Sequence, residues 1–286
     1  MMITRFAPSP TGLLHPGHAF SALSAWQRFR DSPDDVAEKR FLLRIEDIDF
    51  NRCREDYETM LIEDLLWLGL EWEPPVRRQS EHLADFQKVA DDLKTRGFLY
   101  PCFCTRKDIL REIERAGGAP HGSEGPIYPG TCRELSSDEA ASRIEASETF
   151  ALRLNLEKSL AKIGGEITWQ DEAAGTVKAE PELLGDAVLV RKDIGTSYHL
   201  AVVCDDAWQG ITHITRGLDL FESTHLHRVL QELLDFPEPM YFHHELIRDD
   251  SGKRLAKRDE SETLRSWREA GISAAEVKKR LGFEKL

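Results

Sequence analysis

The chain has 286 residues, of which 41% are hydrophobic and 31% charged, with a formal net charge of −13. This length permits one large domain or two modest ones, and the negative charge argues against non-specific coating of nucleic acid but not against a specific RNA partner. No apolar run approaches the roughly 20 residues needed to cross a membrane. The first residues lack the apolar core of a signal peptide, so we expect a cytoplasmic protein.

The first hundred residues alternate between strand and helix patterns. Residues 3–7 form a short apolar run that predicts a buried strand, and the prolines that follow must end it. Helical spacing of apolar residues begins at His18, and residues 41–45 predict a second buried strand. Two further helices should end near Gly69 and Gly97. This alternation favours an α/β fold with a doubly wound, Rossmann-like parallel sheet.

The composition changes after Leu99, where a glycine- and proline-rich segment predicts irregular structure. Ser136 and Glu139 have the spacing of a capping box and predict a short helix. Strand patterns resume at 187–191 and 198–204, and a helix is expected over 222–234. We therefore expect a doubly wound domain in two halves, residues 1–98 and 186–248, separated by a smaller α+β insert at residues 99–185. A basic loop with a helical stub should follow at residues 249–286.

The first loop carries two histidines, His15 and His18, at the start of the predicted helix. Backbone donors at a helix N-terminus attract phosphate, and Gly17 lets a ligand approach the backbone. The two imidazoles are placed to donate to phosphate oxygens as negative charge develops. The spacing alone is weak, because such histidine pairs on a surface helix are often incidental and sometimes bind metal.

A second basic loop, residues 250–258, combines a glycine with four cations and suits a polyphosphate. Taken alone it is more typical of a solvated turn. It is neither a P-loop nor a dinucleotide-binding glycine motif.

Together these loops resemble the class I aminoacyl-tRNA synthetases, and specifically their glutamyl subgroup. Residues 5–12 (Arg-Phe-Ala-Pro-Ser-Pro-Thr-Gly) and the following His-Pro-Gly-His look like the subgroup's opening and first signature. Residues 44–49 and 198–203 continue the match in the same order. Residues 254–258 occupy the place of the second signature, with Ala256 where a serine is common.

The resemblance implies a role for each matching residue. Glutamate would be held by Arg5, Ala7, Ser9, Glu46, Tyr198 and Arg216, with Arg5 or Arg216 pairing with its side-chain carboxylate. ATP would be bound by His15, Gly17, His18 and Lys257, and His15, His18 and Lys257 would serve catalysis. Magnesium is expected to accompany ATP. Without the resemblance, the favoured interpretations would be structural ion pairs for Arg44 and Arg216 and a core position for Tyr198.

The chain ends soon after the second signature, whereas full-length glutamyl synthetases continue with anticodon-binding domains. It therefore resembles a short branch of the family that attaches glutamate to the queuosine base in the anticodon loop of tRNA(Asp). The expected partners are ATP, L-glutamate and tRNA(Asp) carrying queuosine, and we expect a monomer. Residues 248–286 hold eleven Lys and Arg against eight Asp and Glu, a net charge of +3. Whether this basic tail contacts the RNA is left open.

Three of the five cysteines cluster at Cys102, Cys104 and Cys132. Thiolates two residues apart can chelate one Zn²⁺, and a third from a later loop supplies most of a tetrahedron. The resemblance implies Tyr128 as the fourth ligand, with His121 or water as rivals. Four protein ligands imply a structural zinc that orders a segment too poor in apolar residues to order itself. Reduced buried thiols are the alternative.

Three other functions remain open at this point. The chain could be a compact glutamyl- or glutaminyl-tRNA synthetase that charges the acceptor end, which the accepting tRNA would reveal. It could be a non-catalytic, zinc-containing tRNA-binding module, in which case glutamate would not drive ATP–pyrophosphate exchange. It could also be a small-molecule ligase that forms an aminoacyl-adenylate and needs no RNA.

Overall fold

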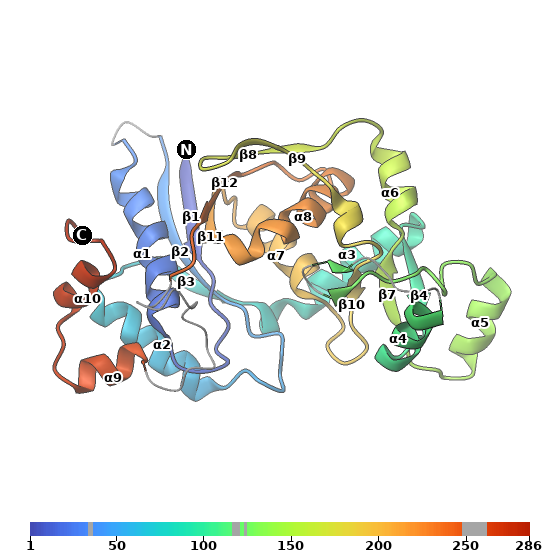
Figure 1. The fold of residues 1–286 in the computed structure, drawn as a ribbon, viewed down its shortest axis with the longest axis horizontal. Coiled ribbons are helices and arrows are strands. Elements are labelled where there is room, and N and C mark those ends of the chain that lie inside the picture. The colour runs from blue at the N-terminus through green and yellow to red at the C-terminus, as the bar shows by residue number, and fades with distance from the viewer. Residues whose placement is uncertain (34–36, 116–120, 123–124, 248–261) are drawn as a thin grey trace.

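The structure, a computed structural model, describes residues 1–33, 37–115, 121–122, 125–247 and 262–286. The molecule is elongated, with a central α/β body, the insert at one end of the long axis and the C-terminal helices at the other (Figure 1). Among the described helices, none is both long and apolar enough to cross a bilayer.

The body is built on a mostly parallel sheet. One part contains β1 (Met2–Phe6), β2 (Lys39–Ile45) and β3 (Glu73–Arg78), all parallel. The other contains the parallel strands β11 (His213–Gly217), β12 (Met240–His244) and β8 (Thr168–Asp171), with β9 (Gly175–Lys178) antiparallel at the edge. The parts join where the Thr212 N–H donates to the Ile3 carbonyl at 2.9 Å.

Helices cover both faces of this sheet. Because side chains alternate along a strand, Leu42 packs into one apolar cluster, whereas Phe41 and Leu43 pack into the other. The first cluster includes residues of α3 (Leu83–Thr95), α7 (Tyr198–Trp208) and α8 (Phe221–Leu233), and the second those of α1 (Pro16–Asp31) and α2 (Glu55–Trp67). Burial on both faces is typical of parallel sheets and confirms the doubly wound α/β prediction.

The insert has its own antiparallel sheet of β4 (Leu99–Cys102), β7 (Ala151–Leu154) and β10 (Val188–Val190). Its other elements are α4 (Arg106–Arg115), β5 (His121–Gly122), β6 (Gly125–Pro126), α5 (Ser137–Glu145) and α6 (Leu156–Ile163). The hairpin of β8 and β9 follows α6 in the chain but pairs with β12 of the main sheet.

The C-terminal helices α9 (Leu264–Glu269) and α10 (Ala274–Arg280) add Leu264 and Val277 to the second apolar cluster. Short 3-10 helices complete the described elements, at Gln79–His82, Pro181–Leu183 and Leu218–Leu220.

Most predicted elements are confirmed within a few residues, and the Ser136–Glu139 capping box forms as expected. The predicted strand at 198–204 is wrong, because these residues form most of helix α7. The Ser197 side chain accepts a hydrogen bond from the Leu200 N–H and caps this helix. A helix that is buried on nearly all sides lacks the regular alternation of apolar and polar faces by which a helix is predicted from sequence.

Asp64 of α2 is a buried carboxylate whose oxygens have no hydrogen-bond partner among the described residues. The nearest cation is Arg268 of α9, with Nη2 at 3.5 Å from Oδ1. Burial raises the pKa of Asp64 to about 6, even though Arg268 opposes the shift. The folded state therefore holds a proton on Asp64 more tightly than the unfolded chain does, and the ionised form opposes folding above about pH 6.

Replacing Asp64 by asparagine is expected to raise the free energy of unfolding at pH 8 by about 1 kcal/mol, after allowance for screening and the lost attraction to Arg268. As the pH falls through 6 toward 4, wild-type Asp64 protonates and this advantage should disappear. Urea unfolding at pH 8 and pH 5 measures the difference. Glu63→Gln is the matched control, because exposed Glu63 also pairs with Arg268, and it should give no gain. A D64N advantage that is equal at both pH values would contradict the assignment.

Candidate active site

A cavity of about 430 Å³ opens where several parallel strands of the main sheet end. Ala7 follows β1, Glu46 follows β2, and Gly217 ends β11, so the cavity lies at the carboxyl edge of the sheet, where open α/β folds bind ligands. The structure brings together nine of the ten residues predicted for glutamate, ATP and catalysis: Arg5, Ala7, Ser9, His15, Gly17, His18, Glu46, Tyr198 and Arg216 line this one cavity. The tenth, Lys257, lies outside the described residues, as does Ala256.

The two signature histidines begin helix α1. The His15 Nδ1 accepts from the Gly17 N–H at 3.1 Å, and the His18 Nδ1 accepts from the His15 N–H at 3.3 Å. The rings stack with centroids 3.8 Å apart. Because each Nδ1 is an acceptor, each neutral ring carries its proton on Nε2, which makes Nε2 a donor suited to a phosphate oxygen.

Arg5 and Arg44 share the buried carboxylate of Asp206 beneath the cavity. Arg5 makes a bidentate pair with Asp206, at 2.8 and 3.2 Å, and the Arg44 Nη1 contacts the same carboxylate at 2.7 Å. Arg44 also donates to the Glu46 Oε1 at 3.0 Å. Burial alone would raise the pKa of Asp206, but Arg44 and Arg5 outweigh it and hold that pKa below its usual range. Arg5 is thus already neutralised by a protein carboxylate.

Glu46 lies at the edge of this network and faces the cavity. Burial raises its pKa, and the attraction of Arg44 and Arg5 only partly offsets the shift. A further cation would stabilise the ionised form of a carboxylate whose pKa is raised by burial. Glu46 is therefore suited to bind an ammonium group.

Arg216 differs from Arg5 because, in the described part of the chain, all its hydrogen-bond partners are neutral. Its Nε donates to the His243 Nε2 at 3.0 Å, and its Nη1 contacts the His227 Nδ1 at 3.3 Å and the Tyr198 hydroxyl at 3.4 Å. Its Nη2 donates to the Thr224 hydroxyl. Burial raises the pKa of Tyr198 to about 12, so the phenol stays neutral as well.

Both imidazoles beside Arg216 stay uncharged. Burial, and then the charge of Arg216, lower the pKa of His243 to about 4 and that of His227 well below its usual value. Arg216 is buried, with 6% of the residue exposed, and yet no contact with a described residue neutralises its guanidinium. An anion that enters the cavity can therefore pair with the Arg216 guanidinium, which is not already paired with a carboxylate of the described residues.

Sequence reasoning missed the residues that support the site. Neither Arg44, within the matched residues 44–49, nor Asp206, just after the matched residues 198–203, was given a role in the site from the sequence. His227, His243 and Asp171 carried no signal, because histidine and aspartate in buried elements show no distinctive spacing. The cavity is also lined by Ser21, Arg52, Thr215, Asp219 and His244, which the sequence did not single out.

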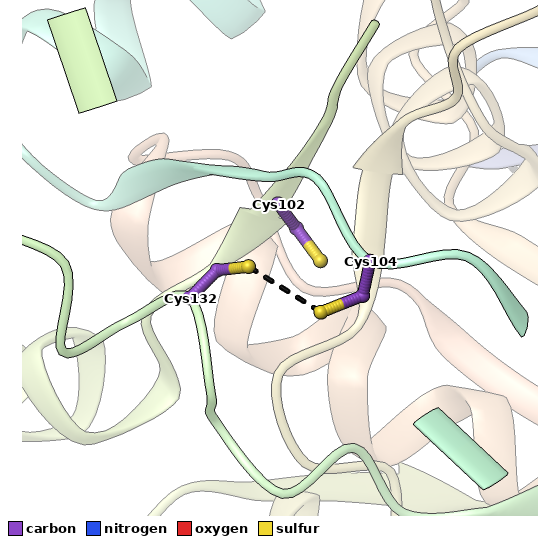
Figure 2. Close-up of side chains that lie close together, drawn as sticks. All are labelled: Cys102, Cys104 and Cys132. Atoms are coloured by element: carbon purple, nitrogen blue, oxygen red, sulfur yellow. Dashed lines mark hydrogen bonds between the residues drawn. The ribbon is translucent and has the colours of Figure 1, made fainter. Parts of the chain in front are cut away.

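The cysteine cluster forms as predicted, in the insert. The sulfur atoms of Cys102, Cys104 and Cys132 lie within 4.8 Å of one another, and Figure 2 shows all three pointing toward a common centre. Tetrahedral Zn–S bonds of about 2.3 Å separate sulfurs by about 3.8 Å, so the spacing fits one metal ion. Burial raises the pKa of Cys104 to about 11, a shift that a bound cation would reverse. These residues can therefore hold a metal ion.

The Tyr128 hydroxyl lies at the same centre. Its oxygen is 3.5 Å from the sulfurs of both Cys102 and Cys104, and it accepts from the Cys132 N–H at 2.8 Å. The Arg153 guanidinium stacks 3.9 Å from the centroid of the Tyr128 ring. The rival ligand His121 has no described side chain.

The class of protein follows from the fold, the site and a family match. Residues 1–278 match the family described as tRNA synthetases class I (E and Q), catalytic domain, and the chain belongs to this family. The resemblance to the glutamyl subgroup is thereby confirmed.

Among individual relatives, the chain is 46% identical to the glutamyl-Q tRNA(Asp) synthetase of Rhodobacter capsulatus, over 99% of this chain and 100% of that protein. It is 36% identical to the glutamate–tRNA ligase of Aquifex aeolicus, over 94% of this chain but only 54% of that protein. The solved glutamate–tRNA ligase of Elizabethkingia meningosepticum, in complex with its amino acid, superposes with a TM-score of 0.74 at 28% identity. That alignment covers 90% of this chain and 52% of the ligase.

Proposed function

We propose that this chain activates glutamate with ATP and transfers the glutamyl group to the queuosine base of tRNA(Asp). It is a ligase of the class I synthetase family and acts as the glutamyl-Q tRNA(Asp) synthetases do. The observation that carries the proposal is the match to the Rhodobacter relative over the full length of both chains. The cavity supports it, because one pocket contains Arg216, which can bind a carboxylate, and Glu46, which can bind an ammonium group. The N-terminus of helix α1 lines the same pocket and can bind phosphates.

Glutamate is oriented by opposite charges at the two sides of the pocket. Arg216 pairs with the side-chain carboxylate, since Arg5 is already engaged by Asp206. Glu46 accepts from the α-ammonium, Tyr198 closes the pocket, and Arg5, Ala7 and Ser9 form its floor. Of the two arginines that the sequence proposed for the side chain, the charge balance favours Arg216.

The chemistry needs positioning and electrostatic stabilisation rather than a covalent enzyme intermediate. The α-carboxylate of glutamate attacks the α-phosphorus of ATP, the bond to the β,γ-phosphates breaks, and pyrophosphate leaves with the bonding electrons. His15 and His18 donate from Nε2 to phosphate oxygens, Gly17 allows close approach, and Lys257 stabilises the departing pyrophosphate. Magnesium accompanies ATP as part of the substrate. The queuosine base then attacks the activated carbonyl and AMP leaves.

The metal centre is proposed to hold a structural zinc ion with Cys102, Cys104, Cys132 and Tyr128 as ligands. The support is the shared centre of the three sulfurs and the tyrosine oxygen. Burial raises the pKa of Tyr128, so the phenol needs the charge of the metal to ionise. The ion would tie the residues after β4 to the later loop that carries Cys132.

The remaining features of the proposal concern organisation. Residues 1–98 and 186–248 form the two halves of the catalytic domain, residues 99–185 the insert, and residues 249–286 the second-signature loop and helical stub. Two elements cross these bounds, because β10 of the second half completes the sheet of the insert and the β8–β9 hairpin of the insert pairs with the main sheet. The protein works as a monomer in the cytoplasm, where its tRNA substrate is found.

The decisive experiment compares RNA acceptors. Radiolabelled glutamate and ATP are incubated with tRNA(Asp) carrying queuosine, with the same tRNA carrying unmodified guanine, and with tRNA(Glu). Label on the queuosine form alone, retained when the 3′-terminal adenosine of the tRNA is removed beforehand, is the expected result. Periodate-sensitive label on tRNA(Glu) would replace the proposal with a compact charging synthetase.

A further inference from the structure

The guanidinium of Arg216 is held by a chain of side chains that begins outside the cavity. Its Nε–H donates to the His243 Nε2 at 3.0 Å, so that nitrogen must present a lone pair. The proton of the neutral ring is then on Nδ1, which donates to the Asp171 Oδ2 at 2.6 Å. His243 does not line the cavity. Among the described residues, its hydrogen bonds toward the site are those with Arg216 and Thr224.

Asp171 is itself fixed by the backbone. Its Oδ1 accepts from the N–H groups of Ala173 and Ala174, at 2.9 and 3.0 Å, in the turn between β8 and β9. Burial opposes its charge, but the hydrogen bonds from His243 and from these N–H groups prevail and keep the pKa of Asp171 below its usual value. Oδ2 is therefore an ionised acceptor with one orientation, and it determines which nitrogen of His243 carries the proton.

A second chain of side chains, His227 and then His199, starts at another nitrogen of the guanidinium, Nη1. The His227 Nδ1 faces Arg216, so its Nε2–H points to the His199 Nδ1 at 3.1 Å. Arg216 is thus fixed from two directions by neutral rings. The full negative charge of Asp171 is kept one imidazole away, so it orients the arginine without occupying the face that a ligand needs.

We propose that Asp171 and His243 are positioning residues for glutamate recognition, which hold the Arg216 guanidinium in the orientation that receives the side-chain carboxylate. This inference rests on the proposed function in one respect only, namely that glutamate is the amino acid bound. The pair does not touch substrate. It acts by keeping an unneutralised arginine rigid, which removes an ordering cost from binding.

Asp171→Asn tests the inference because the backbone dictates how the new amide must lie. Its carbonyl oxygen has to accept from Ala173 and Ala174, which turns the NH2 group toward His243. The ring must then accept at Nδ1 and carry its proton on Nε2, so that two donors face each other at Arg216. We expect the KM for glutamate to rise about tenfold or more, as for an unsatisfied buried donor, with the KM for ATP nearly unchanged.

Two variants of His243 separate positioning from simple packing. His243→Gln retains an acceptor near the Nε2 position and should keep the KM for glutamate within a few-fold of wild type, whereas His243→Leu should resemble D171N. Adding D171N to H243Q should change the KM little further, because no tautomer remains to be inverted. Asp186→Asn is the matched control, since Asp186 is a buried carboxylate that packs against the insert and also accepts a backbone N–H.

The measurement is glutamate-dependent ATP–pyrophosphate exchange without RNA, with thermal unfolding recorded for every variant. A D171N protein with the wild-type KM for glutamate overturns the inference, as do equal losses in H243Q and H243L. Transfer to RNA is assayed separately. Failure of queuosine labelling with the predicted KM pattern intact would refute the proposed acceptor but leave the positioning role standing.

Discussion

Replacing Arg216 by glutamine is expected to lower kcat/KM for glutamate in ATP–pyrophosphate exchange by at least about 100-fold, the usual consequence of leaving a buried charge without its partner. The carboxylate of the substrate would enter a pocket whose other arginines, Arg5 and Arg52, are already paired with Asp206 and Asp49. Most of the loss should appear in the KM for glutamate, because the side-chain carboxylate takes no part in the reaction.

The same substitution should leave stability nearly unchanged. In the described part of the chain, all the hydrogen-bond partners of Arg216 are neutral, so its removal strands no protein carboxylate. Arg44→Gln provides the contrast, because Arg44 is fully buried and joins Asp206 to Glu46. It should cost about 3 kcal/mol or more in the free energy of unfolding. Near-wild-type kcat/KM in R216Q would contradict the assigned role, whatever the stability of either variant.

Replacing Cys132 by serine is expected to abolish stoichiometric metal binding and to lower the midpoint of thermal unfolding by about 10 °C, which corresponds to about 3 kcal/mol for a chain of this size. The loss of structure should begin in the insert, because the cysteine cluster and the cavity have no residue in common. Protein that remains folded should still bind ATP.

Elemental analysis and calorimetry measure the two effects together. Cys53→Ser is the control, since Cys53 is half-buried, lies outside the cluster and should retain both metal and stability. A chelator applied to the wild type should reproduce the C132S midpoint. One metal ion per chain in C132S would show that the cluster is not the binding site.

The sequence was most informative where short-range patterns dictate structure. The turn after β1, the apolar spacing of α1 and the Ser136–Glu139 cap all act over a few residues, and all were predicted correctly. The resemblance to glutamyl synthetases predicted nine site residues that the structure places in one cavity. No local pattern relates them, because they come from distant parts of the sequence. The helix α7 was missed because burial on nearly all sides erases the periodicity that distinguishes a helix from a strand.

The sequence did not predict which charged side chains of the site are paired with one another and which are available to a ligand. Whether Arg5 or Arg216 is available to a ligand depends on Asp206 and on His243, each brought there by a different element of the fold. Neutral imidazoles in particular cannot be predicted, because their pKa values depend on burial that only the folded structure defines.

The junction between β1 and β11 has a consequence for the timing of synthesis. Arg5 and Asp206 are 201 positions apart, and Ile3 reaches Thr212 across 209. A ribosome adding about 5–20 residues per second needs on the order of ten seconds or more to pass from one side of the cavity to the other. During that interval β1 can pair with β2 but lacks β11 on its other side, and the cavity residues that follow β1 lack those contributed by α7 and β11. The cavity is therefore completed only late in synthesis, and a chain released before Arg216 lacks that arginine and the lining residues that follow it.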